Sequence, residues 1–108
     1  MDPTIEELIK TLSELAEVLD SDGASRWSSW IRTAAQRLDK GDSSGVDYLL
    51  GAYGGVGSIN DLILGQTTHN GTFAWKLGHV ALNERFESLR NKTWQLAQHI
   101  RRSQHAGA

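Results

Sequence analysis

Apolar residues recur at steps of three and four in three long segments of this chain, and that spacing predicts amphipathic helices. The segments are residues 3–19, residues 27–38 and a last one that starts between residues 77 and 83 and ends at 102. A length of 108 residues suits one domain with one core. We therefore expect an all-α fold. Residues 1–102 should form a single compact bundle of four to five helices, and residues 103–108 a flexible tail.

The first helix has a clear start signal. Asp2 is a favoured N-cap, and Pro3 suits the first helical position, where its missing N–H costs nothing. Thr4 with Glu7 offers an alternative capping box. The apolar stripe of this helix consists of Ile5, Leu8, Ile9, Leu12, Leu15, Ala16 and Leu19.

Four glutamates, Glu6, Glu7, Glu14 and Glu17, lie mostly off that stripe. Charged residues on the polar side of a helix usually form a solvated face. The alternative is an acidic surface that binds a partner protein. We keep the four glutamates, together with Trp75, as candidate partner-binding residues.

Trp27 and Trp30 lie one turn apart within the stripe of the second helix. A tryptophan ring can bury on the order of 200 Å² of surface. We expect both rings in the core, the alternative being an exposed aromatic hot spot for a partner. A short third helix, with Val46, Leu49, Leu50 and Tyr53 on its buried side, should follow.

The segment "YGGVGSINDLIL", residues 53–64, contains glycines of the kind that cradle phosphates. A phosphate loop requires a lysine, and this segment has none. A dinucleotide fingerprint requires a preceding strand and a third glycine, whereas this segment follows a predicted helix and lacks that glycine. It predicts a corner between two short helices instead. Gly54 should take positive φ, Gly55 and Gly57 should bend the chain, and Ser58 with Asp61 should cap the next helix.

Asn60 has no assigned role in this corner. Its amide can tie the loop to a neighbouring helix, or it can contact a ligand together with Asp61. Residues 62–64, an apolar run, should pack inward. Residues 65–79 leave two alternatives open: a small hairpin within 65–76 around Asn70-Gly71, or an ordered loop. In either case we expect Trp75 to anchor this segment onto the core.

Composition excludes several classes of chemistry. The chain has no cysteine, so it has no disulfide or thiolate site, and its four histidines lack the spacing of a helical zinc site. We identify no catalytic residue, no metal site and no cofactor. The net charge of −2 argues against a nucleic-acid partner. No apolar run is long enough to cross a membrane, and "MDPTIEELIK" is no secretory signal, so we expect a cytoplasmic protein.

Three features together resemble a family of small bacterial domains of unknown function. They are Trp27 with Trp30, the segment "LLGAYGGVGSINDLIL", and "NERFESLRNKTWQLAQHIRR". The resemblance covers most of residues 27–102 and rests on a Gly-Gly-x-Gly-Ser-x-Asn-Asp-Leu signature. It implies a compact helical protein without an established activity. It marks as the family-defining segment Gly54, Gly55, Gly57, Ser58, Asn60, Asp61 and Leu62.

Small acidic chains without catalytic residues are typical of proteins that act by binding. The expected function is therefore a non-enzymatic protein-interaction module, with the profile of an immunity or antitoxin-like protein that neutralises a toxin. The alternative is a small-molecule-binding domain or unusual hydrolase with a polar site around Ser58, Asn60 and Asp61. The sequence leaves the partner and the oligomeric state open.

Overall fold

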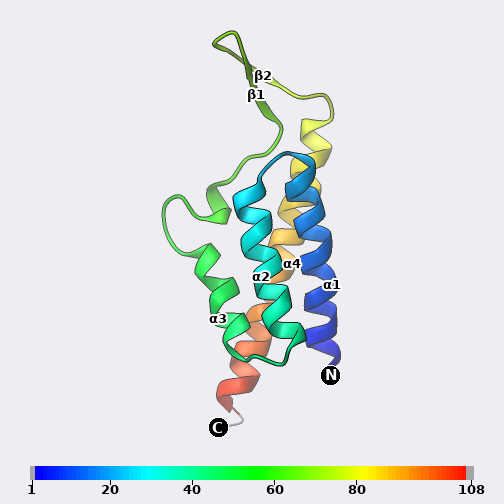
Figure 1. The fold of residues 1–108 in the computed structure, drawn as a ribbon, viewed down its shortest axis with the longest axis vertical. Coiled ribbons are helices and arrows are strands. Elements are labelled where there is room, and N and C mark those ends of the chain that lie inside the picture. The colour runs from blue at the N-terminus through cyan, green and yellow to red at the C-terminus, as the bar shows by residue number, and fades with distance from the viewer. Residues whose placement is uncertain (1, 107–108) are drawn as a thin grey trace.

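The computed structural model describes residues 2–106, which form four α-helices and a two-stranded antiparallel sheet (Figure 1). The helices are α1 (Pro3–Ser21), α2 (Ser25–Asp39), α3 (Ser44–Leu50) and α4 (His79–Ala106), and the strands are β1 (Gln66–His69) and β2 (Thr72–Trp75). Two short 3₁₀ helices, Gly51–Tyr53 and Ile59–Asp61, flank the glycine-rich corner. The predicted, mainly helical compact fold is confirmed, and the sheet is a small hairpin of the kind that the sequence left open for residues 65–76.

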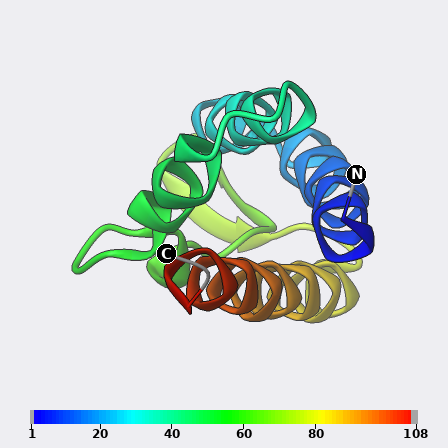
Figure 2. The same cartoon turned by 90° about the horizontal axis from the view of Figure 1, so that it is seen from below.

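The helices surround a single core. α1 packs against α2 and α4, and α3 packs against α2 and α4, so the four helices form a ring when viewed along their axes (Figure 2). The first apolar stripe faces this core as predicted. The buried apolar side chains of the described residues are Leu8, Leu12, Leu15, Ala16, Val18, Leu19, Ile31, Ala34, Leu38, Val46, Leu49, Ala52, Ile59, Leu64, Phe86, Leu89, Ala97 and Ile100.

Local signals at the ends of the first two helices account for their boundaries. Asp2 is the N-cap of α1 and accepts a hydrogen bond from the N–H of Thr4 at 2.7 Å, with Pro3 at the first helical position. Gly41 follows α2 with φ +77°, and its N–H donates to the carbonyl of Leu38. This is the left-handed conformation that glycine adopts at low cost after a helix.

Trp27 and Trp30 lie at the edge of the core rather than inside it. Both are half-buried against the core cluster, and their rings stack with centroids 5.8 Å apart. The indole N–H of Trp30 donates to the carbonyl of Tyr48 at 2.9 Å, which joins α2 to α3. Trp30 therefore lies in the seam between these helices, and Trp27 stacks on it.

α4 is longer than the sequence indicated. It begins at His79, within the expected range of residues 77–83, and it continues past the expected end at residue 102 to Ala106. The prediction of a boundary at residue 102 is wrong for the helix, because no proline or glycine interrupts residues 103–106. Residues 107–108 of the expected tail lie outside the described residues.

Residues 66–75 form the hairpin, which decides between the two alternatives for this segment. Asn70 (φ +52°) and Gly71 (φ +78°) form its two-residue turn, and Gln66 pairs with Trp75 at its base. Positive φ at both turn positions is what a type I′ hairpin requires. The hairpin extends beyond the end of the bundle rather than packing along it (Figure 1).

Candidate functional site

The glycine-rich corner differs in detail from the sequence prediction. Gly54 has φ −91°, so the expected positive φ at this residue is wrong; Gly55 (+77°) and Gly57 (+78°) take that conformation instead. The 3₁₀ helix Gly51–Tyr53 prolongs α3, which moves the sharp reversal one residue further along the chain.

The polar side chains of this corner are engaged in local hydrogen bonds. Ser58 accepts from the N–H of Asn60 at 3.2 Å, and Asp61 accepts from the N–H of Gly57 at 2.7 Å. The amide of Asn60 donates to the carbonyl of Tyr53 at 3.5 Å. These contacts close the loop on itself, so they favour a structural role for Ser58, Asn60 and Asp61.

The apolar run after the corner does not pack inward as a whole. Leu64 is buried and Leu62 is half-buried, but Ile63 is exposed. The expected inward packing is therefore wrong for Ile63. The backbone is extended at Leu62, and alternate side chains of an extended segment point in opposite directions.

A small hollow beside the corner is the feature of this region that most resembles a ligand site. It has a volume of about 230 Å³ and is lined by Tyr53, Asn60, Asn91, Trp94 and Gln95. The hydroxyl of Tyr53 donates to the carbonyl of Arg90 at 2.7 Å, and burial raises the pKa of this phenol. Tyr53 is thus a fixed hydrogen-bond donor that stays protonated at neutral pH.

The structure offers no clustered metal ligands in the part of the chain that it describes. No group of three or more histidine, cysteine, aspartate or glutamate side chains in residues 2–106 is placed to hold a metal ion. Likewise, none of the described helices combines the length and apolarity needed to cross a membrane.

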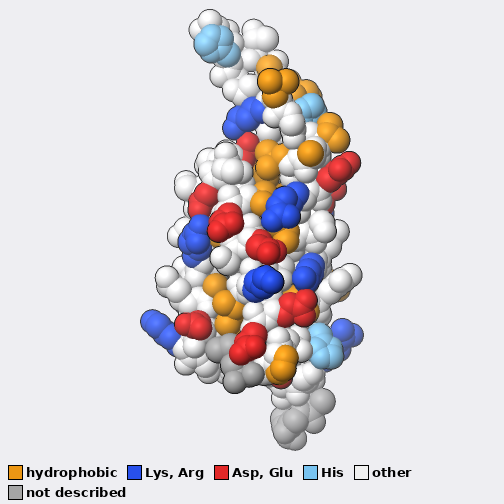
Figure 3. All heavy atoms as spheres, turned by 90° about the vertical axis from the view of Figure 1, so that its right-hand side faces the viewer, with side chains coloured by type: hydrophobic (Ala, Val, Ile, Leu, Met, Phe, Trp, Pro, Cys, Tyr) orange, Lys and Arg blue, Asp and Glu red, His pale blue; other side chains and the backbone are white. Residues whose placement is uncertain are grey.

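The glutamates of α1 lie on a face of mixed charge. Glu7 forms an exposed ion pair with Lys92 of α4 at 3.2 Å, and a groove of about 360 Å³ contains Glu6, Glu14 and Lys10 beside this pair. Acidic and basic side chains are interspersed over this side of the molecule (Figure 3). Such a face lacks the strong negative potential expected of an acidic binding surface.

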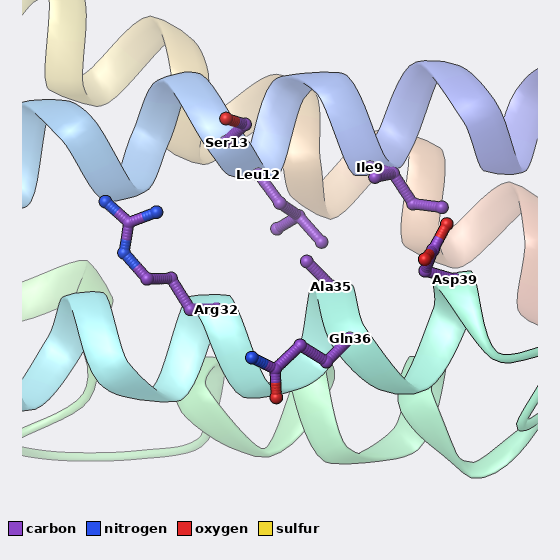
Figure 4. Close-up of a pocket in the computed structure, with 7 residues that line it drawn as sticks. All are labelled: Ile9, Leu12, Ser13, Arg32, Ala35, Gln36 and Asp39. Carbon is purple, nitrogen blue, oxygen red and sulfur yellow. The ribbon is translucent and has the colours of Figure 1, made fainter.

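A second groove runs between α1 and α2 on the outside of the bundle. Leu12 of α1 and Ala35 of α2 face each other across it, and Arg32 extends from α2 toward α1 (Figure 4). Arg32 pairs with Asp20 at 2.6 Å, and this contact lowers the pKa of Asp20. The groove is open to solvent. Arg32, which lines it, already forms an ion pair with Asp20 of the same chain.

The hairpin, the short link after it and the first turn of α4 carry exposed apolar surface with aromatic character. Phe73 and Trp75 are 53% and 45% exposed, and Leu77 and Val80 are 105% and 60% exposed. Hydrophobic side chains gather near the hairpin end of the molecule (Figure 3). We call Phe73, Trp75, Leu77 and Val80 the hairpin patch.

Trp75 is not the core anchor that the sequence suggested. Its ring stacks on His79 with centroids 4.7 Å apart, and Phe73 meets its edge at 5.1 Å. The expectation was wrong because the strands end before they reach the bundle. Trp75 therefore packs within the hairpin and the start of α4 and leaves much of its surface in water.

A polar junction that sequence reasoning missed holds the hairpin to the bundle. Asp22, at the end of α1, accepts from the N–H of Gly65 at 3.0 Å and pairs with Lys76 at 2.9 Å. Asn83 binds both the N–H (2.9 Å) and the carbonyl (2.8 Å) of Leu64. Asn83 lies one turn inside α4, which begins at His79.

A comparison with protein families finds a match to part of the chain. Residues 20–72, about half of the chain, match the model of a family described as a domain of unknown function (DUF6966). The match spans α2, α3, the glycine-rich corner and the first strand, and it stops within the hairpin. No curated protein and no solved structure matches the chain.

Proposed function

We propose that this protein is a non-enzymatic protein-interaction module and that the hairpin patch is its contact surface. The observation that carries the proposal is the exposure of two aromatic side chains on a hairpin that projects from the bundle, and of two aliphatic side chains where the chain leaves the hairpin and enters α4. Contiguous apolar surface on a small domain marks interaction sites, and aromatic residues are frequent hot spots.

The firm attachment of the hairpin supports this function. Gly65 and Lys76 form the base of the hairpin, and both are bonded to Asp22 of the bundle. The backbone also pairs there, with the N–H of Lys76 donating to the carbonyl of Gly65 at 2.8 Å. A preorganised contact element loses less conformational entropy on binding than a free loop does.

We infer a cytoplasmic protein of the bacterial family described by the Gly-Gly-x-Gly-Ser-x-Asn-Asp-Leu signature, with an immunity or antitoxin-like role. The absence of cysteine fits a reducing compartment. The mixed charge of the α1 face makes Glu6, Glu7, Glu14 and Glu17 the weaker candidates for binding a toxin-like partner, and Trp75 the stronger one.

The alternative site around Ser58, Asn60 and Asp61 stays a prediction without support from the contacts. All three side chains are engaged with nearby backbone groups. The small hollow beside them contains no paired carboxylate or histidine among its lining residues. We therefore do not put forward a hydrolase or a small-molecule function.

Affinity capture with three forms of the full chain tests the proposed function. The forms are the wild type, the double variant Phe73→Ser/Trp75→Ser, and the control Trp94→Ser. Trp94 is the matched control because it is also 45% exposed and lies on α4, about 22 Å along the helix axis from His79, the residue on which Trp75 stacks. We expect the wild type and the control to retain the same protein, whether another protein or a second copy, and the double variant to lose it. Equal retention by all three forms would overturn the proposal.

A further inference from the structure

The strand register shows which backbone groups of the hairpin face outward. The N–H of Lys76 bonds to the carbonyl of Gly65, and hydrogen-bonded and non-hydrogen-bonded pairs alternate along an antiparallel ladder. The next pair, Gln66 with Trp75, and the pair Thr68 with Phe73 are therefore the non-hydrogen-bonded ones. The backbone N–H and C=O groups of Phe73 and Trp75 point away from β1, toward the open edge of β2.

Nothing in the hairpin sequence protects this edge from pairing. Natural proteins blunt exposed strand edges with charged residues, proline or bulges. Residues 66–75 contain no lysine, arginine, aspartate, glutamate or proline. The four pairs of the register are regular and include no bulge. The nearest charge, on Lys76, is already paired with Asp22.

The order of residues along β2 makes this edge complementary to itself. In an antiparallel pairing centred on Ala74, Phe73 of one copy lies opposite Trp75 of the other, and Trp75 lies opposite Phe73. These residues present the outward N–H and C=O groups that such a pairing bonds. All four rings then share one face, where aromatic cross-strand pairs stabilise a sheet.

The surface available is of the size that a weak dimer buries. The hairpin patch exposes on the order of 400 Å² of apolar side-chain surface per copy, which is within the range of functional patches. Strand pairing also covers the backbone of the edge, and the total stays below the roughly 800 Å² per partner of a standard interface, as expected for a weak, reversible dimer. Because the strands are uncharged, two copies meet without repulsion at the contact.

We propose that the partner of the hairpin patch is a second copy of this chain, joined through its β2 edge into a four-stranded antiparallel sheet with Ala74 on the two-fold axis. This inference rests on the proposed function, because it assigns the partner of that same surface. It goes further by fixing the strand, the register and the symmetry of the contact.

Sedimentation equilibrium of the full chain over a range of concentrations tests the association. We expect the wild type to dimerise with a dissociation constant in the micromolar range. Ala74→Lys should weaken the dimer by about tenfold or more, because it places like charges directly opposite each other. Thr67→Lys is the matched control: Thr67 pairs with Ala74 on the same face but lies in β1, so its charge should leave the dimer largely intact.

A single introduced cysteine tests the register, since the chain has none of its own. Ala74→Cys should cross-link on mild oxidation, because the two copies of a residue in a directly opposed non-hydrogen-bonded pair lie about 4.5 Å apart between Cα atoms. Thr67→Cys should not, because three strand spacings, about 14 Å, separate its two copies.

The outcomes separate this inference from the proposed function. A wild type that stays monomeric at millimolar concentration overturns the second-copy inference. So does a wild-type dimer in which Ala74→Cys fails to cross-link. In either case, if the wild type captures another protein and Phe73→Ser/Trp75→Ser does not, the proposed function stands with a different partner. If it captures nothing through the hairpin patch, both fail.

Discussion

At the scale of the residue, Gly65 is the position where the structure depends most on the absence of a side chain. It has φ +82°, and an added Cβ would lie 2.6 Å from the Cβ of His79. We expect Gly65→Ala to lower the free energy of unfolding by about 3 kcal/mol, since backbone strain and steric overlap add. Guanidinium denaturation followed by circular dichroism measures this.

Gly55 provides the control for that substitution. Its φ of +77° is nearly the same, but nothing lies within 4 Å of an added Cβ. Gly55→Ala should therefore cost about 1 kcal/mol, the strain term alone. Equal losses for the two variants would show that the contact with His79 contributes nothing.

Asn83 is the residue whose role is least visible in the sequence. Its amide bonds both the N–H and the carbonyl of Leu64, whose side chain is buried. We expect Asn83→Ala to destabilise the protein by about 2 kcal/mol, because it leaves two backbone groups without their partners. Asn91→Ala, at an exposed position of the same helix, should change the free energy of unfolding by less than about 0.5 kcal/mol. A similar loss for both would contradict the role given to Asn83.

At the scale of the element, the hairpin turn should affect association without affecting the bundle. Asn70 has φ +52°, a conformation that asparagine tolerates better than alanine does. Asn70→Ala should loosen the register of β1 and β2 and weaken self-association several-fold, while the melting temperature changes little. Sedimentation equilibrium and thermal melting in dilute solution provide the two readings; a large fall in melting temperature would show that the hairpin supports the bundle.

The sequence could predict the features that are set by residues close together in the chain. The stripe of α1, the cap at Asp2 and the hairpin turn at Asn70-Gly71 all depend on neighbours in the chain, and the structure confirms them. Gly54 and Trp75 were placed wrongly because their surroundings depend on where the following segment runs. The contacts of Asp22 and Asn83 join residues 43 and 19 positions away, so no local pattern reveals them.

At the scale of the whole molecule, the structure divides into a body and a projection. The helices bury the core, and the long axis of 55 Å exceeds the other two, 24 and 20 Å, partly because the hairpin extends beyond them (Figure 1). Leu12, which is fully buried, therefore contributes to the stability of the body. Trp75, which is half-exposed, contributes to the surface of the projection.

This division predicts a contrast in stability. Leu12→Ala should cost about 2–5 kcal/mol, as large-to-small changes in a core do. Phe73→Ser/Trp75→Ser should cost less than about 1 kcal/mol when measured in dilute solution, where the chain is monomeric. Chemical denaturation of both variants at low protein concentration makes the comparison; comparable losses would place the hairpin aromatics within the stabilising core.

Amide hydrogen exchange, measured residue by residue as the concentration of the full chain rises, tests the central claim most directly. The account predicts that the amides of Phe73 and Trp75 exchange fast in dilute solution, because they point to an open edge. They should become protected as the chains associate, whereas the amide of Ala74, already bonded to β1, should change less. If association instead protects the face formed by α1 and α4, and Phe73 and Trp75 stay fast throughout, the hairpin is not the contact surface.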